Sequence, residues 1–315
     1  MTTAPSAEPA TDPLSALEDA ARRVADRVGP ATVSIGRSGR GSGVVVADGR
    51  VLTNAHNLRD RTTQVLFGDG RREQATVSGA DPHGDLVVLE VDTGDIEPVE
   101  FARTDTDVGA VVFAVARGLR GTRIGFGLVS GTQRPFRGPR GRRISGGLEH
   151  SAPLARGSSG GPLVDRAGHV VGINTHRLGD GFYLAQPTDE VLRSKVDRMG
   201  AGEHIERPTL GVAVAPPQVA HRLRRAVGLP DRDGLLVRGV DDDGPAARAG
   251  IGEGDLLVRA GERPLDSVDA LFDVLDGHDG VAPLDLLVVR GTDELTVTVT
   301  FTGSTDEPAG SSEQV

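Results

Sequence analysis

Short runs of β-branched and other apolar residues, separated by glycine or aspartate, recur along this chain and constrain its fold more than any other feature. β-Branched residues favour strands, and glycine supplies the left-handed dihedral angles that tight turns between strands require. The 44 glycines make up about 14% of the 315 residues, twice the usual ~7%, and follow no collagen period. The sequence therefore predicts a mainly β protein with strands at hairpin spacing. The clearest runs cover residues 31–35, 43–46, 51–53, 64–67 and 86–91.

The composition argues against several classes of function. With 45 acidic side chains against 35 Lys and Arg, the formal charge is −10, so electrostatic binding of nucleic acid or of an anionic membrane is not expected. Cysteine is absent, which excludes disulfides, thiolate catalysis and zinc–cysteine sites. No window approaches the ~20 apolar residues of a membrane span, and the first residues lack the features of a secretory signal. We therefore expect a cytoplasmic protein without a membrane span.

Two folding units are expected. The first, residues 14–205, contains the valine-rich runs described above. In the second, residues 206–302, strand-like and helix-like segments alternate, and the unit closes on the alternating apolar strand 295–301, which predicts an α+β fold. The polar segments 1–13 and 303–315 are predicted to be disordered.

A glycine cluster around Ser159 carries the strongest sign of chemistry. The serine stands in the segment Arg156-Gly-Ser-Ser-Gly-Gly-Pro-Leu-Val164, just before an apolar strand. Glycine lets the backbone approach a substrate carbonyl and lets consecutive N–H groups point inward, as an oxyanion hole requires. The same segment read alone fits an ordinary glycine-rich turn equally well.

Two further residues make the catalytic interpretation stronger. His56 follows the apolar strand 51–53, and Asp85 precedes the strand 86–91. A serine hydroxyl becomes a good nucleophile when a histidine takes its proton and a buried carboxylate orients that histidine. The chain order His, Asp, Ser in a β-rich domain is that of chymotrypsin-type enzymes.

Taken together, the motifs resemble those of the HtrA (Deg) family of serine proteases, over about residues 20–302. The resemblance implies a chymotrypsin-like double β-barrel for residues 14–205, followed by an α+β PDZ domain at residues 206–302. The motifs are Gly41-Ser-Gly-Val-Val45, Thr53-Asn-Ala-His56, Asp85-Leu-Val-Val-Leu89, Gly157-Ser-Ser-Gly-Gly-Pro-Leu163, Val171-Gly-Ile-Asn-Thr175, Asp243-Gly-Pro-Ala-Ala-Arg-Ala-Gly-Ile251 and Gly254-Asp-Leu-Leu257.

The resemblance implies a role for each matching residue. His56 would be the general base, Asp85 the carboxylate that orients it, and Ser159 the nucleophile. The main-chain N–H groups of Gly157 and Ser159 would form the oxyanion hole.

The chain departs from the family pattern at three places. Ser158 stands where family members usually have Asn, and Asn57-Leu58 replaces the usual pair of β-branched residues, a change that we expect to affect packing more than proton transfer. Leu154-Ala-Arg156 occupies the place of a common Asn-Pro pair, which puts the shape of the substrate pocket in question but not the triad.

The segment Phe182–Pro187 resembles the strand that lines the primary specificity pocket in this family. This segment carries no charge. Together with Ile173, its residues Phe182 and Leu184 indicate an apolar pocket for a small or medium aliphatic side chain. The alternative is that these are ordinary barrel-core positions.

In the second unit, Leu210-Gly211-Val212 resembles the loop and strand that receive a peptide C-terminus in bacterial PDZ domains. Such a peptide adds a strand to an exposed sheet edge. Leu271 and Leu275, four residues apart on an expected helix, either line that groove or belong to the core.

The other polar clusters are weaker signals. The arginines between Arg134 and Arg143 fit a solvated loop, although the resemblance places them among regulatory loops that could sense an acidic partner. The remaining histidines show no metal-ligand spacing, so neither a metal nor an organic cofactor is expected.

The resulting hypothesis is an ATP-independent serine endopeptidase that cleaves unfolded or misfolded polypeptides through an acyl-enzyme, with a PDZ domain that binds peptide C-termini or regulates activity. The alternative is a protease-like chaperone or peptide-binding protein with little or no hydrolysis. The resemblance further implies a homotrimer.

Overall fold

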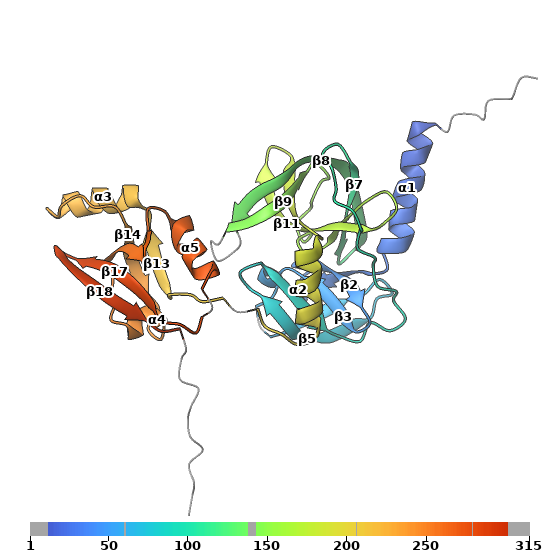
Figure 1. Cartoon of the computed structure of the whole chain (residues 1–315). Coiled ribbons are helices and arrows are strands. Elements are labelled where there is room, and N and C mark those ends of the chain that lie inside the picture. Colours follow the sequence, from blue (N-terminus) through green and yellow to red (C-terminus); the bar gives the residue numbers. More distant parts are fainter. Residues whose placement is uncertain (1–11, 60, 138–142, 206, 279, 302–315) are drawn as a thin grey trace, which may run out of the picture. The chain divides into compact units, whose positions relative to one another are not determined.

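The chain folds into two compact units, Met1–Glu206 and Arg207–Val315, and each is described by itself. Figure 1 shows the computed structural model, coloured along the sequence. Most of the two segments predicted to be disordered, 1–13 and 303–315, falls outside the described part of the chain. The described residues are 12–59, 61–137, 143–205, 207–278 and 280–301.

Two closed barrels of antiparallel strands make up the first unit (Figure 1). The first barrel has the strand order β1-β2-β3-β6-β5-β4, with β1 (Thr32–Ile35), β2 (Gly41–Ala47), β3 (Arg50–Thr53), β4 (Thr62–Leu66), β5 (Arg72–Asp81) and β6 (Leu86–Glu90). The second has the order β10-β11-β12-β9-β8-β7, with β7 (Val111–Gly118), β8 (Gly121–Arg137), β9 (Arg143–His150), β10 (Pro162–Val164), β11 (Val170–Gly179) and β12 (Phe182–Pro187). The predicted double β-barrel is confirmed.

A shared apolar core joins the two barrels. Val44 and Leu52 of the first barrel and Phe113 and Val164 of the second are at most 1% exposed and belong to one cluster of packed side chains. Because interiors are packed as densely as organic crystals, this cluster fixes how the two barrels face one another. Residues on facing edges of the two barrels are thereby held in a constant relation.

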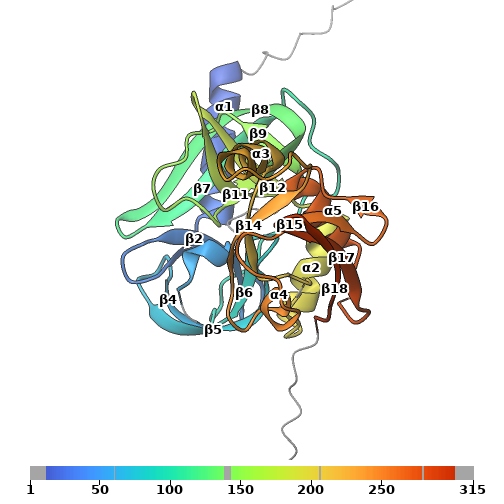
Figure 2. The same cartoon turned by 90° about the vertical axis from the view of Figure 1, so that its left-hand side faces the viewer.

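Two helices extend this core. Helix α1 (Pro13–Val28) begins at the N-cap Asp12, whose side chain accepts from the N–H of Leu14, and contacts β7 and β8 (Figures 1 and 2). Helix α2 (Glu190–Gly200) begins at the N-cap Asp189 and contacts β5 and β6. Each helix contributes the apolar side chains of one face to the shared core.

The second unit is a sheet with the order β13-β14-β15-β17-β18, in which β16 pairs with β15. Together with its helices it confirms the predicted α+β fold. Its elements are β13 (Val212–Ala215), α3 (Pro217–Ala226), β14 (Leu235–Val240), α4 (Pro245–Arg248), β15 (Leu256–Ala260), β16 (Arg263–Pro264), α5 (Val268–Asp276), β17 (Leu284–Arg290) and β18 (Asp293–Val299).

Strand β5 was not predicted from the sequence. It spans Arg72–Asp81 and exposes much of one face, so its polar residues form no continuous apolar run. Its pairing with β4 and β6 along its length explains why a polar sequence forms a strand here.

No helix among the described residues is long and apolar enough to cross a bilayer.

Candidate active site

His56 lies in the short 3-10 turn η1 (Ala55–Asn57), immediately after β3 ends. Its side chain is 32% exposed and lines a cavity of about 650 Å³ that also includes Leu58, Arg59 and Asp85. The histidine is thus fixed by a rigid strand and remains accessible from solvent.

Asp85 occupies the turn between β5 and β6 and is fully buried. Its φ of 57° is in the left-handed region, which aspartate enters more readily than most residues. The carboxylate accepts from the Nδ1 of His56 at 2.7 Å and from the N–H of His56 at 3.0 Å. These two contacts hold both the ring and the backbone of the histidine.

The contact with Asp85 determines the tautomer of His56. An ionised carboxylate can only accept, so Nδ1 of the ring carries the proton and Nε2 is left as a proton acceptor. This is the form that a general base requires.

Ser159 lies on a tight turn that glycine makes possible. Gly157 and Gly160 have φ values of 86° and 85°. A Cβ on Gly160 would lie 2.2 Å from the carbonyl oxygen of Ser42, so no other residue fits there without displacement of the backbone. The turn packs directly on β2.

The main chain of this turn is anchored to the first barrel. The Oγ of Ser42 donates to the carbonyl oxygen of Gly157 at 2.7 Å, and the N–H of Ser42 donates to that of Ser159 at 2.8 Å. The Nδ2 of Asn57 also donates to the carbonyl of Ser159, at 2.9 Å. This turn, residues 156–160, carries the predicted nucleophile Ser159 and is called the nucleophile turn below. It is therefore attached to the barrel that carries His56 and Asp85.

In this structure the hydroxyl of Ser159 donates to the carbonyl oxygen of Thr175, at 3.0 Å. Within the described chain it forms no hydrogen bond with His56. The structure thus brings His56 and Asp85 into direct contact and anchors Ser159 beside them, with the hydroxyl turned to β11. Catalytic hydrogen bonds are often formed only when substrate is bound.

The main-chain N–H groups of Gly157 and Ser159 donate to no group of the described residues, whereas those of Ser158 and Gly160 donate to the carbonyls of Ala155 and Asn174. Two unengaged N–H donors beside a nucleophile can bind the negative oxygen of a tetrahedral intermediate.

Thr175 and His176 on β11 also contact this site, and their roles were not predicted from the sequence. The Oγ1 of Thr175 donates to Asp85 at 3.3 Å and lies 2.8 Å from the Nδ1 of His176. The ring centroid of His176 is 6.2 Å from that of His56. Burial lowers the pKa of His176 and so disfavours a second positive charge near His56. Thr175 is the last residue of the motif Val171–Thr175, and this motif was the sequence signal that could have identified it as a residue of the site.

The residues of the predicted specificity pocket occupy different environments. Ile173 is fully buried in the core shared by the barrels, and Leu184 is 1% exposed. Phe182, at the start of β12, is 38% exposed. Ile173 therefore has the packing of a barrel-core residue, which was the alternative interpretation.

In the second unit, Leu210, Leu271 and Leu275 pack in one apolar cluster and are at most 4% exposed. Gly211 has a φ of 71°, and Val212 opens β13, the end strand of the sheet. In the described residues the outer edge of β13 has no partner strand, which is the edge that an added peptide strand requires.

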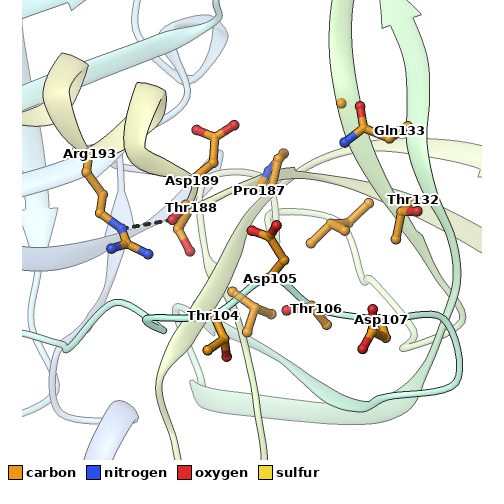
Figure 3. Close-up of a pocket in the computed structure, with 13 residues that line it drawn as sticks. Thr104, Asp105, Thr106, Asp107, Thr132, Gln133, Pro187, Thr188, Asp189 and Arg193 are labelled. Atoms are coloured by element: carbon orange, nitrogen blue, oxygen red, sulfur yellow. Dashed lines mark hydrogen bonds between the residues drawn. The ribbon is translucent and has the colours of Figure 1, made fainter.

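Figure 3 shows a separate cavity of about 310 Å³ in the first unit, whose lining includes none of His56, Asp85 and Ser159. Its lining includes Asp189, which caps α2 by accepting from the N–H of Leu192, and Arg193, which donates to the carbonyl of Thr188 at 2.9 Å. These charged groups hold α2 in place. Among the described residues, no group of three or more His, Asp or Glu side chains could hold a metal ion.

Comparison with known proteins gives two domain matches. Residues 41–173 match the trypsin-like peptidase domain, and residues 208–301 match the PDZ domain.

Curated relatives extend over most of the chain. The mitochondrial serine protease HTRA2 of Bos taurus is 32% identical over 306 residues, which cover 88% of this chain and 66% of the relative. A probable periplasmic DegP-like serine endoprotease of Brucella suis biovar 1 is 33% identical over 279 residues, covering 82% of this chain and 52% of the relative. The crystal structure of the serine endoprotease from Yersinia pestis superimposes with a TM-score of 0.61 at 27% identity, covering 89% of this chain and 96% of that one.

Proposed function

Because this chain belongs to the HtrA family of serine proteases, we propose that it is an ATP-independent serine endopeptidase whose substrates are unfolded or misfolded polypeptides. The chain spans about half to two thirds of the length of the curated relatives named above. The observation that carries the proposal is the oriented pair of His56 and Asp85, joined at 2.7 Å, beside the anchored turn of Ser159.

The first half of the reaction forms an acyl-enzyme. The Oγ of Ser159 attacks the scissile carbonyl while the Nε2 of His56 takes the hydroxyl proton, and Asp85 stabilises the imidazolium. The N–H groups of Gly157 and Ser159 bind the carbonyl oxygen as it becomes negative. The C–N bond then breaks, and His56 returns the proton to the leaving amine.

The second half regenerates the enzyme. Water replaces the leaving amine and attacks the acyl carbon while His56 takes a proton from it. The resulting tetrahedral intermediate collapses, the bond to the Oγ of Ser159 breaks, and His56 returns the proton to that Oγ as the carboxylic acid is released. Before the first step the hydroxyl must turn from the carbonyl of Thr175 toward His56, because its proton is donated to Thr175 at rest.

This function is tested by labelling the full-length protein with a fluorophosphonate probe, beside the Ser159→Ala variant and a parallel digestion of unfolded casein. We expect Ser159-dependent labelling and loss of casein. Labelling that survives in Ser159→Ala would contradict the assignment of the nucleophile.

A second candidate function is a protease-like peptide-binding protein with negligible hydrolysis. The orientation of the Ser159 hydroxyl toward Thr175 favours it, since this rotamer does not offer the proton to His56. A protein that the fluorophosphonate probe labels only after addition of hydrophobic C-terminal peptides would be a regulated protease. No labelling with or without these peptides would favour the binding protein.

For the second unit we propose binding of peptide C-termini along the outer edge of β13. The support is the unpartnered edge together with Gly211 at the start of the strand. A PDZ-directed peptide should bind through its free C-terminal carboxylate and lose affinity when that carboxylate is amidated.

We also propose that the full chain forms the homotrimer that the family resemblance implies. Light scattering of the full chain measures this oligomeric state.

A further inference from the structure

An arginine-lined cavity of about 480 Å³ lies beside the nucleophile turn and has no role in the mechanism described above. Its lining includes four guanidinium groups and no carboxylate of the described chain, in a protein with a formal charge of −10. The complete lining is Ser38, Gly39, Arg40, Gly118, Leu119, Arg120, Arg123, Arg156 and Gly157.

The walls of this cavity lie close against one another. A Cβ on Gly39 would lie 3.3 Å from the side chain of Leu119, and one on Gly157 would lie 2.8 Å from the carbonyl oxygen of Gly39. The Oγ of Ser42 accepts from the N–H of Arg117 at 3.0 Å and donates to Gly157 at 2.7 Å. The β1–β2 turn, the β7–β8 turn and the nucleophile turn therefore meet around the cavity.

The guanidinium groups are available to a ligand. Arg40, Arg120, Arg123 and Arg156 are exposed, and in the described parts of the chain none of them forms an ion pair. A guanidinium group presents several donors in a planar fork that matches a carboxylate. Arg40 also lines a neighbouring cavity of about 410 Å³ together with Arg37 and Arg59, again without a carboxylate in the described lining.

The position of the cavity determines which part of a substrate reaches it. In the proposed function, residues before the scissile bond lie toward β11 and β12, the strands of Thr175 and of the predicted pocket. The cavity takes no lining residue from either strand and meets the site at Gly157, one of the proposed oxyanion donors. An extended chain that passes Ser159 therefore carries the residues after the scissile bond toward the arginines.

We propose that this arginine-lined cavity binds an acidic side chain of the substrate on the leaving-group side of the scissile bond, and thereby makes acidic sequences the preferred cleavage sites. The inference rests on the proposed peptidase function. An exposed ion pair changes affinity by roughly 1.5- to 5-fold, so convergence of two or more guanidinium groups gives a selectivity of about fivefold. The selectivity falls with salt, because ions screen charges that are exposed to solvent.

The test maps cleavage sites in unfolded, dephosphorylated casein by mass spectrometry. At low salt we expect Asp and Glu to be enriched about three- to fivefold in the first few positions after the scissile bond. Arg120→Gln/Arg123→Gln should remove most of this enrichment. The matched control Arg23→Gln/Arg166→Gln, which removes the same charge from two exposed arginines of the first unit that line neither arginine cavity, should retain it.

A binding measurement separates this inference from the peptidase function. C-terminally amidated peptides that differ only in Glu or Gln are titrated into the Ser159→Ala variant, so that neither hydrolysis nor a free carboxylate contributes. We expect the Glu peptides to bind about fivefold more tightly, and Arg120→Gln/Arg123→Gln to equalise the pair.

Absence of casein cleavage both without and with added hydrophobic C-terminal peptides would contradict the peptidase function, while the charge selectivity of binding would still be measured. Equal binding of Glu and Gln peptides, or an acidic enrichment confined to positions before the scissile bond, would overturn the proposed role of the cavity.

Discussion

Asn57 donates a hydrogen bond from its side-chain Nδ2 to the main-chain carbonyl of Ser159, at 2.9 Å. The same amide reaches the Oγ1 of Thr53 at 3.0 Å, and the residue is 3% exposed. Asn57 follows His56 directly in the chain. It therefore links the turn of the proposed general base to the turn of the proposed nucleophile through one buried amide.

Replacement of Asn57 by Val, a β-branched residue of the kind usual at this place in the family, should slow labelling of Ser159 about three- to tenfold. The carbonyl of Ser159 keeps the N–H of Ser42 as a donor but loses the amide of Asn57. Loss of one such hydrogen bond costs about 0.5–1.5 kcal/mol, and part of that cost falls on the geometry of the nucleophile turn. The measurement is the second-order rate of fluorophosphonate labelling per folded molecule. Thr53→Ser is the control, because it alters a neighbouring buried residue but keeps the hydroxyl that bonds to Asn57 and to the carbonyl of Ser42. Equal labelling rates in both variants would show that Asn57 has only a packing role.

The Asp85→Asn variant should retain the fold and lose about 10³- to 10⁴-fold in kcat. Asparagine also tolerates the left-handed φ of 57° at this position. Its amide would donate to the Nδ1 of His56, which places the ring proton on Nε2 and removes the general base. Steady-state hydrolysis of casein measures the loss. Asp165→Asn, which alters the 3.2 Å contact between Asp165 and His169 outside the site, should leave kcat unchanged.

His150 makes the stability of the first unit sensitive to pH. It is fully buried, and burial lowers its pKa from 6.5 to about 4. The unfolded chain binds a proton near pH 6.5 and the folded chain only near pH 4, so the unfolded state holds more protons between these values. The stabilisation is complete above pH 6.5 and is lost as the pH falls toward 4. Between about pH 7.5 and about pH 5 the loss is about 2 kcal/mol.

Tyr183 gives a direct readout of this loss. It is the only tyrosine in a chain without tryptophan, and its ring stacks on His150 at 5.9 Å. Urea unfolding followed by tyrosine fluorescence therefore reports on the first unit within the full chain. His150→Leu should flatten the pH dependence, whereas substitution of the partly exposed His169 by Gln should preserve it. An unchanged slope in His150→Leu would contradict this assignment.

The Lys195→Met variant should destabilise the first unit by about 3 kcal/mol. The Nζ of Lys195 lies 2.8 Å from the fully buried carboxylate of Asp81, which loses this cation in the variant. Asp81 also accepts from the N–H of Gly84 at 2.7 Å, immediately before Asp85. Urea unfolding measures the loss, with Arg166→Met as a surface control. A change below about 1 kcal/mol would show that the pair is electrostatically weak.

How much of this site the sequence could predict depends on how local each signal is. His56, Asp85 and Ser159 stand in short motifs next to apolar strands, so neighbouring residues identify them. Asn57 was expected to affect packing, because its bond to Ser159 joins positions 102 residues apart and no local pattern records such a contact. The arginine cavity is also non-local, since its guanidinium groups come from three turns and from the start of β8, which meet only in the folded barrels.

The same reasoning applies to the fold. Strands that carry apolar runs were predicted, and the polar strand β5 was missed because tertiary pairing, not composition, makes it a strand. Ile173 shows the reverse case. Its apolar character fits both a pocket and a core, and only the packing around it indicates the core.

Gly157→Ala should abolish detectable labelling of Ser159 while changing the overall fold little. The φ of 86° at Gly157 disfavours any Cβ by about 1–2 kcal/mol, and the added carbon would lie 2.8 Å from the carbonyl oxygen of Gly39. Relief of that contact must move the N–H that we propose binds the developing oxyanion, and loss of one such donor costs about 10²- to 10³-fold in kcat. Gly118→Ala is the matched control on the opposite rim of the arginine cavity, because a Cβ there meets nothing within 4 Å. If both variants are labelled at the wild-type rate, the N–H of Gly157 is not part of the oxyanion hole.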